Sequence, residues 1–107
     1  MIKHIKTMKI INNDFSIDGC LDLLRAMSDR TRQEIVMIFA SHNEVCVNDI
    51  AKNFTLSRPT ISHHLNLMKR AKLLNTRKKG KEIFYSFNKS YVTKLIGSIL
   101  NSLKKCC

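Results

Sequence analysis

The chain has 107 residues, of which 44% are hydrophobic, 3 are glycine and 1 is proline. This length allows one domain with a single modest core, and the composition favours a compact, mostly helical fold. The longest apolar run, residues 35–40, is too short to cross a bilayer, and the N-terminal residues contain no uninterrupted apolar segment typical of a signal peptide. We therefore expect a cytoplasmic protein with no membrane partner.

Positive charge is concentrated in the second half of the chain. Residues 1–54 contain seven Lys or Arg and seven Asp or Glu, whereas residues 55–107 contain twelve Lys or Arg and one acid, Glu82, which leaves the net charge of +11 there. Nucleic acid is the first candidate partner for such a surface; an anionic membrane surface is the second candidate by charge alone, and of the two we expect nucleic acid. An enzyme is not expected, because no nucleophile–base pair and no glycine-rich phosphate loop is evident.

The apolar spacing predicts two helices in the first half. The first is a core helix over residues 16–27, preceded by an arm at residues 1–15 that lies outside the predicted domain at residues 16–107. Its core face is expected to contain Ile17, Cys20, Leu21 and Leu24. Asp29 is predicted to cap the second helix. The residues of that helix expected to face inward are Ile35, Ile38 and Phe39.

Residues 44–74 predict a short extended segment followed by two helices in close succession. Asn48 is expected to cap the first of these helices, and Ser57 the second, with Pro59 in the first turn, where N–H groups have no intrahelical partner. The inward residues are predicted to be Ile50, Ala51 and Phe54 in the first helix and Ile61, Leu65, Met68, Leu73 and Leu74 in and after the second.

Residues 75–87 change to the spacing of a β-hairpin with a basic tip at Gly80 and Lys81. A last helix is predicted from about Lys89. Its apolar stripe is wide and consists of Tyr91, Val92, Leu95, Ile96, Ile99, Leu100 and Leu103. One small domain has little core left to cover such a stripe, so it predicts the seam of a homodimer.

A short helix, a tight turn and a helix capped by Ser57 form a helix-turn-helix, and the basic hairpin makes the motif winged. The predicted fold is thus mainly α with a small β-hairpin wing. The front of the second helix in such motifs reaches base edges in the major groove of double-stranded DNA, where Arg58 is suited to guanine. The candidate DNA-binding residues are Ser57, Arg58, Thr60, Ser62 and His63 on this helix and Arg77, Lys78, Lys79 and Lys81 in the wing.

Four segments resemble the ArsR/SmtB family of bacterial winged-helix repressors in order and spacing. They are AMSDRTR at residues 26–32, EVCVNDIA at 44–51, LSRPTISHHL at 56–65 and GKEIFY at 80–85, and the resemblance covers about residues 17–105. It implies a homodimer held by its first and last helices that binds an imperfect palindrome near a promoter. It usually implies repression that a metal or an oxidant relieves.

The sequence departs from the sensor sites of this family. Many members that sense arsenic, cadmium or lead carry Cys-Val-Cys where this chain has Cys46, Val47 and Asn48, and one thiolate alone is a poor site for a soft metal. Zinc-sensing members of the family have zinc ligands at four positions of the last helix, and this chain has no zinc ligand at any of them. They are occupied by Lys89, Tyr91, Ser102 and Lys105.

A thiol- or metal-responsive repressor remains the alternative. Its candidate residues are Cys20, Cys46, Cys106 and Cys107. Lysines next to the last two cysteines favour reactive thiolates, and a vicinal pair with a third ligand can chelate As(III) or Zn(II). Equally, Cys20 fits a core position and the tail fits a functionless end. The sequence therefore assigns no cofactor, and the alternative interpretation calls for a thiophilic metal or metalloid. A more distant alternative is a basic module that binds an acidic protein.

Overall fold

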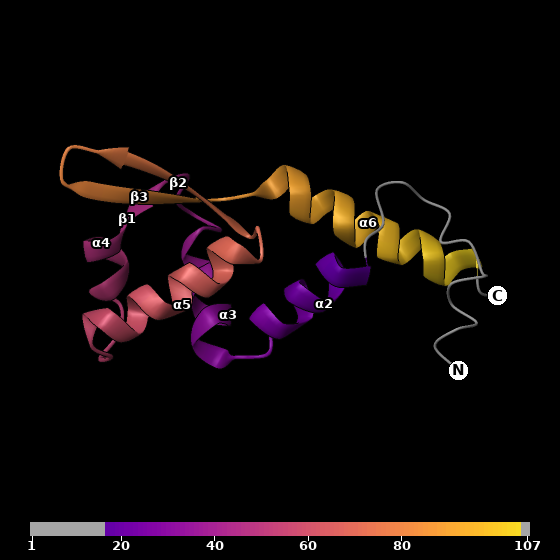
Figure 1. Cartoon of the computed structure of the whole chain (residues 1–107), viewed down its shortest axis with the longest axis horizontal. Helices are drawn as coiled ribbons and strands as arrows, with labels where there is room; N and C mark the ends of the chain where they lie inside the picture. The colour runs from indigo at the N-terminus through magenta and orange to yellow at the C-terminus, as the bar shows by residue number, and fades with distance from the viewer. Residues whose placement is uncertain (1–16, 106–107) are drawn as a thin grey trace.

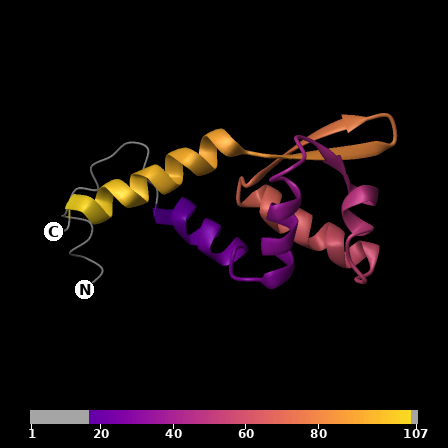
Figure 2. The ribbon, with the colours of Figure 1, turned by 180° about the vertical axis from the view of Figure 1, so that it is seen from behind.

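The computed structural model describes residues 17–105, so the predicted arm at residues 1–15, Cys106 and Cys107 lie outside the described residues. Within this range the elements follow in the order α2 (Ile17–Ala26), α3 (Arg30–Ile38), β1 (Val45–Cys46), α4 (Val47–Ala51), α5 (Arg58–Arg70), β2 (Leu74–Lys79), β3 (Glu82–Phe87) and α6 (Lys89–Lys105). Helices α2 and α6 lie side by side, while α4, the start of α5 and the hairpin tip lie at the other end (Figures 1 and 2). The predicted mainly helical fold with a β-hairpin wing is confirmed.

Helix α5 lies at the centre of the core. Its residues Ile61, Leu65 and Met68, spaced by four and three, are all 0% exposed, as are Ile35 of α3 and Ile50 of α4. Burying each such side chain is worth about 1.5–3 kcal/mol. This packing fixes the orientation of α5 and leaves the opposite face of the helix free for another partner.

The ends of α3 and α5 are set by local hydrogen bonds. The Asp29 carboxylate accepts the backbone N–H of Arg32 at 3.1 Å, which confirms the predicted cap of α3. Helix α5 ends in a Schellman motif. Lys72 takes a left-handed φ of 65°, and the N–H of Leu73 reaches back to the carbonyl of Met68 at 2.9 Å. This turn directs the chain from α5 into the wing.

The predicted cap of α4 is wrong. Asn48 lies inside the helix, whose N-cap is Cys46 and whose first helical residue is Val47. The reason is the sheet: Cys46 pairs with Phe84 of β3, so strand β1 runs directly into α4 without a loop that Asn48 could close.

The wing is part of a three-stranded antiparallel sheet in the order β1-β3-β2. Only Gly80 and Lys81 join the paired residues Lys79 and Glu82, and Gly80 has a φ of 62°. A type II′ turn requires a positive φ at the first of its two central residues, and glycine is preferred there. The hairpin was predicted from the sequence, but its pairing with β1 was not.

The predicted core face of α2 is exposed in this chain. Ile17, Leu21 and Leu24 are 43%, 41% and 63% exposed, and the residues that α2 buries are Gly19 and Ala26. The physical reason is that α2 lies along α6 and away from most of the core around α5, so one of its faces has no neighbour (Figure 1).

The last helix confirms the wide apolar stripe. Val92 and Leu95 are buried, whereas Ile96, Leu100 and Leu103 are 44%, 53% and 60% exposed. The exposed apolar faces of α2 and α6 therefore occur together at one end of the molecule. No helix among residues 17–105 is long and apolar enough to cross a membrane.

Candidate nucleic-acid interface

The front of α5 carries a built cap and exposed polar side chains. The Ser57 hydroxyl accepts the backbone N–H of Thr60 at 3.3 Å, and the two hydroxyl oxygens are 2.9 Å apart. The predicted cap is confirmed. Pro59 lies in the first turn as predicted, and Arg58 and His63 are exposed. Because Pro59 has no N–H and the N–H groups of Thr60 and Ile61 are bonded to Ser57, it is mainly the positive end of the helix dipole that makes this terminus suitable for a phosphate.

A groove of about 250 Å³ separates the front of α5 from the wing and α4. Arg58 and Ser62 line it from α5, and Lys81 lines it from the hairpin tip, so these three predicted residues come together. Asn66 lines it as well and is not among the residues predicted from the sequence. The signal was available, because positions 58, 62 and 66 are spaced by four and share one helical face.

The wing lysines differ from the wing arginine. Lys78, Lys79 and Lys81 are exposed and form no ion pair with any residue in the described range. Arg77, by contrast, donates two hydrogen bonds to the Glu44 carboxylate, at 2.8 and 2.7 Å. Hydrogen bonding from Arg77 holds the pKa of Glu44 below its usual value.

The Arg77 guanidinium also lies over the ring of Phe84, with 5.4 Å to the ring centroid. Its side chain is therefore held on two sides, by the Glu44 carboxylate and by this ring. The bidentate pair compensates its charge. Of the four wing residues that the sequence suggested, Arg77 is thus the one whose charge is already neutralised by a neighbour.

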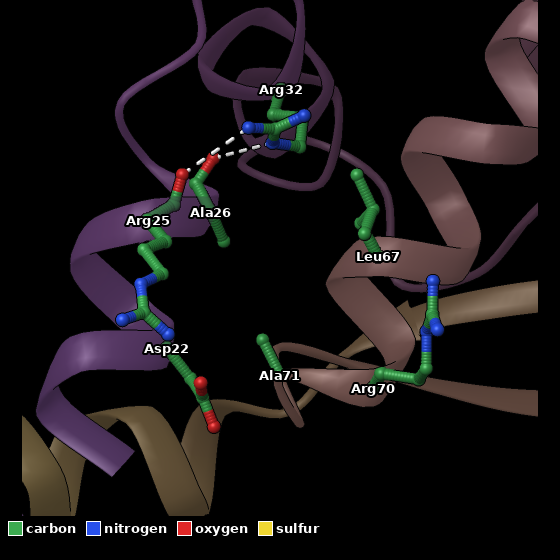
Figure 3. A pocket seen from close by; sticks show the side chains of 7 residues that line it. All are labelled: Asp22, Arg25, Ala26, Arg32, Leu67, Arg70 and Ala71. Carbon is green, nitrogen blue, oxygen red and sulfur yellow. Dashed lines mark hydrogen bonds between the residues drawn. The ribbon is translucent and has the colours of Figure 1, made fainter. Parts of the chain in front are cut away.

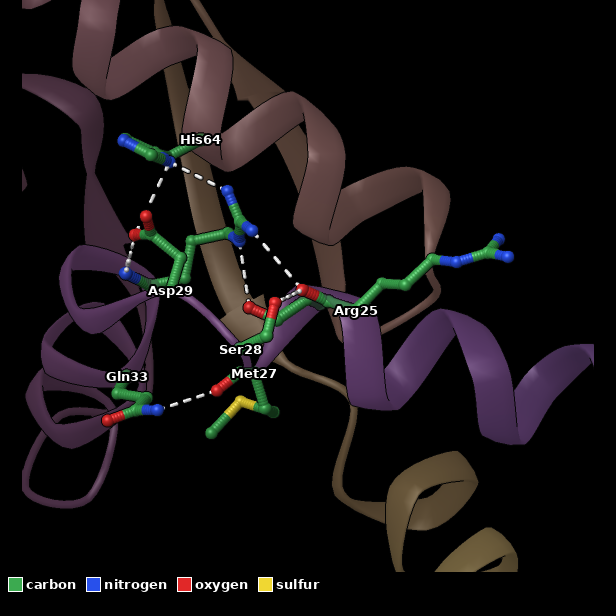
Figure 4. A network of polar contacts seen from close by, with 8 residues as sticks. Arg25, Met27, Ser28, Asp29, Gln33 and His64 are labelled. Carbon is green, nitrogen blue, oxygen red and sulfur yellow. Dashed lines mark hydrogen bonds and ion pairs between the residues drawn. The ribbon is translucent and has the colours of Figure 1, made fainter.

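A second arginine, Arg32 of α3, connects helix α5 to the end of α2. The Arg32 side chain donates to the carbonyls of Ala26 and Arg25, at 2.7 and 3.2 Å, and its Nη1 lies 3.1 Å from Nδ1 of His64 on α5 (Figures 3 and 4). Because a guanidinium can only donate, this contact requires neutral His64 with Nδ1 as acceptor. Burial lowers the pKa of His64, against the opposing effect of Asp29, whose carboxylate lies 3.9 Å away.

The two histidines of α5 therefore face different surroundings. His63 is exposed, whereas the His64 side chain is 13% exposed and turned towards α3. The sequence predicted a role for His63 but none for His64, because the partner of His64, Arg32, is 32 residues away along the chain.

The cysteines of the described range do not meet. Cys46 is buried in β1 and its thiol donates to the Asp49 carboxylate at 3.3 Å, whereas Cys20 lies half-buried on α2. The backbone N–H of Asp49 favours the Cys46 thiolate, but burial and the Asp49 carboxylate outweigh it and raise the pKa of the thiol. Burial also raises the pKa of Cys20. Neither environment promotes a reactive thiolate.

A metal site is not assembled by residues 17–105. These residues contain no group of three or more His, Cys, Asp and Glu side chains that could hold a metal ion. Cys46 and Asp49 supply two donors, and thiophilic metals need three or four. The described residues therefore do not by themselves fit a thiophilic metal or metalloid, and the predicted partners Cys106 and Cys107 lie outside them.

Known proteins place this surface in context. The family model described as "Bacterial regulatory protein, arsR family" matches residues 29–76. The chain is 36% identical over 84 residues to the transcriptional repressor SdpR of Bacillus subtilis, covering 78% of this chain and 92% of that protein. It is 32% identical over 87 residues to the arsenical resistance operon repressor of Staphylococcus aureus, covering 79% of this chain and 83% of that protein.

The fold agrees with a solved structure of the same type. An ArsR-like transcriptional regulator from Rhodococcus sp. RHA1 superposes with a TM-score of 0.73 at 24% identity, over 82% of each chain. The exposed front of α5, the basic wing and the relatives together identify a DNA-binding transcriptional regulator and not an enzyme. The chain belongs to the ArsR family of bacterial regulatory proteins.

Proposed function

We propose that this protein is a cytoplasmic repressor that binds an imperfect DNA palindrome as a homodimer. The observation that carries the proposal is the division of the molecule into two ends. One end presents the polar front of α5 beside the basic wing, and the other presents the apolar faces of α2 and α6 (Figure 1). A second copy that covers these faces buries them. Its two-fold axis puts two α5 helices on successive major grooves, roughly 34 Å apart.

Base readout is assigned to α5. Arg58 is suited to O6 and N7 of guanine, and Asn66, on the same face, is suited to N6 and N7 of adenine. Contacts with DNA phosphates are assigned to the helix cap and to the exposed wing lysines. The complete set proposed for readout is Arg58, Thr60, Ser62, His63 and Asn66, and the set proposed for phosphates is Ser57, Lys78, Lys79 and Lys81.

A pair of single substitutions tests these roles. Arg58→Ala is expected to cost about 1–3 kcal/mol of binding free energy, concentrated at one base position. Lys79→Ala is expected to weaken all sequences alike and to flatten the dependence of log K on log salt by about 0.9 for each protomer of the bound dimer. Fluorescence anisotropy with a fragment from upstream of the protein's own gene, and with random DNA, measures both effects. If Arg58→Ala weakens random DNA as much as the operator, the assignment of readout to Arg58 is wrong.

The homodimer has its own test. Leu100→Asp places a charge on the exposed apolar face of α6 and is expected to yield monomers in sedimentation velocity. Ile83→Asp is the matched control, because Ile83 is 42% exposed but lies on the wing, and it should leave the dimer intact. A wild-type protein that sediments as a monomer at micromolar concentration would show that the dimer proposal is wrong.

A thiol- or metal-responsive repressor is a second candidate. The observation that favours it is that Cys46 lines the same groove as Arg58 and Ser62, so a group attached to its sulfur would be close to the proposed DNA surface. Adding As(III), Zn(II), Cd(II) or a persulfide donor to the reduced complex tests it. Release of DNA that a Cys46→Ser variant no longer shows would support a sensor at Cys46. Binding unmoved by all four would contradict it.

A further inference from the structure

A second cavity, of about 300 Å³, lies between α2, the start of α3 and the C-terminal half of α5 (Figure 3). Its charged lining consists of Arg25, Arg32, Arg70 and Asp22. None of these residues belongs to the proposed DNA-binding set. Three guanidinium groups and one carboxylate leave this cavity with an excess of positive charge.

Two of these arginines have no fixed partner. The guanidinium groups of Arg25 and Arg70 form no hydrogen bond or ion pair with any other residue in the range 17–105. Asp22, although it lines the same cavity, is not within ion-pair distance of either. Both arginines are exposed at the rim and free to change rotamer. Arg70 extends away from Arg25 in Figure 3, so contact of both with one ligand involves a change of rotamer.

The third arginine is already held in place. Arg32 uses three of its five N–H groups, towards the carbonyls of Ala26 and Arg25 and towards His64. All three acceptors are neutral groups, and the remaining two N–H groups have no acceptor among the described residues. A guanidinium that is oriented before binding loses little side-chain entropy when it meets an oxyanion.

The remaining lining is apolar. Ala26 and Ala71 are buried, and Leu67 is half-buried between them and the rim. We propose that this cavity binds a small organic anion, with a carboxylate or phosphate head held by Arg25, Arg32 and Arg70 and a compact apolar body against Leu67 and Ala71. The cavity volume is at the lower end of the usual range for ligand sites, about 300–1,000 Å³, which limits the ligand to a small molecule.

Such a ligand is coupled to DNA binding through Arg32. The same guanidinium that lines the cavity bonds to His64 on α5 and to the end of α2. An anion that binds the Arg32 guanidinium therefore perturbs its hydrogen bonds to His64 of α5 and to the last residues of α2. We expect the affinity for operator DNA to change as a result. This coupling rests on the proposed function, whereas the binding of the anion does not.

The binding test uses the full-length wild-type protein without DNA. Benzoate and phenyl phosphate are the probes, benzyl alcohol is the uncharged counterpart, and acetate and inorganic phosphate represent the head group alone. Isothermal titration calorimetry is expected to show saturable binding of benzoate or phenyl phosphate, weaker binding of acetate and inorganic phosphate, and none of benzyl alcohol. Which of the two aromatic anions binds more tightly identifies the preferred head group.

Variants locate the site. Arg25→Gln and Arg70→Gln are each expected to raise the Kd for the anion by about tenfold, since each removes a charge-assisted hydrogen bond. Arg30→Gln is the control, because Arg30 is an exposed arginine of α3 outside the cavity. The proposal is overturned if no probe binds saturably up to about 10 mM, well above a millimolar Kd. It is also overturned if benzyl alcohol binds as well as benzoate, or if Arg30→Gln loses as much affinity as Arg25→Gln.

Coupling is measured separately. Saturating benzoate is expected to shift the operator Kd of the wild type, and Arg25→Gln is expected to need about tenfold more benzoate for the same shift. If benzoate binds but does not shift the operator Kd, the coupling is wrong and the site stands. If the protein binds no operator at all, the proposed function fails, and the calorimetry still reports on the site.

Discussion

The bidentate pair between Arg77 and Glu44 leads to a testable prediction, because the Glu44 carboxylate neutralises an arginine of the wing that we propose contacts DNA. In Glu44→Gln, Arg77 loses the carboxylate charge that now accepts its hydrogen bonds at 2.7 and 2.8 Å, so its own charge becomes available to a phosphate. We therefore expect this substitution to tighten DNA binding. The wing itself should persist, because β2 and β3 are paired at every position from Leu74 opposite Phe87 to Lys79 opposite Glu82.

The expected size follows from counterion release. One additional phosphate contact steepens the slope of log K against log salt by about 0.9, which at about 0.1 M salt corresponds to roughly eightfold tighter binding per protomer. The thermal stability should change little, because both side chains are solvent-exposed to a large extent, 54% for Arg77 and 33% for Glu44.

The assay is anisotropy with operator DNA over a range of salt, from about 50 to 300 mM. Glu82→Gln is the matched control: it removes an acid from the same wing but frees no arginine, since Glu82 forms no ion pair within residues 17–105. The double variant Glu44→Gln/Arg77→Gln should return the slope to the wild-type value. Equal gains for Glu44→Gln and Glu82→Gln would refute the reasoning, since the effect would then be general charge. Weaker binding by Glu44→Gln would instead mean that the clamp positions the wing.

Three further predictions concern α5 and β1. Burial lowers the pKa of His64 in the folded protein, whereas the unfolded chain takes up a proton at this histidine below about pH 6.5. The free energy of unfolding should therefore fall as the pH drops from about 6.5 through the lowered pKa. Chemical denaturation at a series of pH values should show a shallower fall for His64→Gln than for the wild type. Ser57→Ala should cost about 0.5–2 kcal/mol in urea unfolding, because the N–H of Thr60 loses its cap, and a Ser90→Ala variant, changed at an exposed serine without a cap bond, should not. With the other three cysteines replaced by serine, Cys46 should react with Ellman's reagent more slowly than a free thiol, and a rate equal to that of cysteine would contradict its burial and raised pKa.

Much of the fold could be predicted because it depends on short-range spacing. The caps at Asp29 and Ser57 each involve a residue three positions away, and the core face of α5 follows from residues three or four apart. The two-residue hairpin turn is likewise local, since it needs a glycine at position 80. The predicted site residues Arg58, Ser62 and Lys81 do line one groove. Their individual roles at DNA remain predictions.

Other features could not be predicted because they join residues far apart in the chain. The cap at Asn48 failed because β1 pairs with β3, some 40 residues later, and runs straight into α4. The exposed face of α2 has the same apolar spacing as a buried one, and only its position along α6 shows that it lacks a neighbour in this chain.

The sequence by itself determined where charge and apolar stripes lie and where α3 and α5 are capped, and hence a winged helix-turn-helix whose second half is basic. The tertiary structure alone decided how the charged side chains are used. Arg77 and Glu44 are 33 residues apart, and Arg32 and His64 are 32 apart. Whether a guanidinium is free to bind a phosphate or is already held by a neighbour depends on these long-range contacts, because an ion pair or hydrogen bond requires only closeness in space.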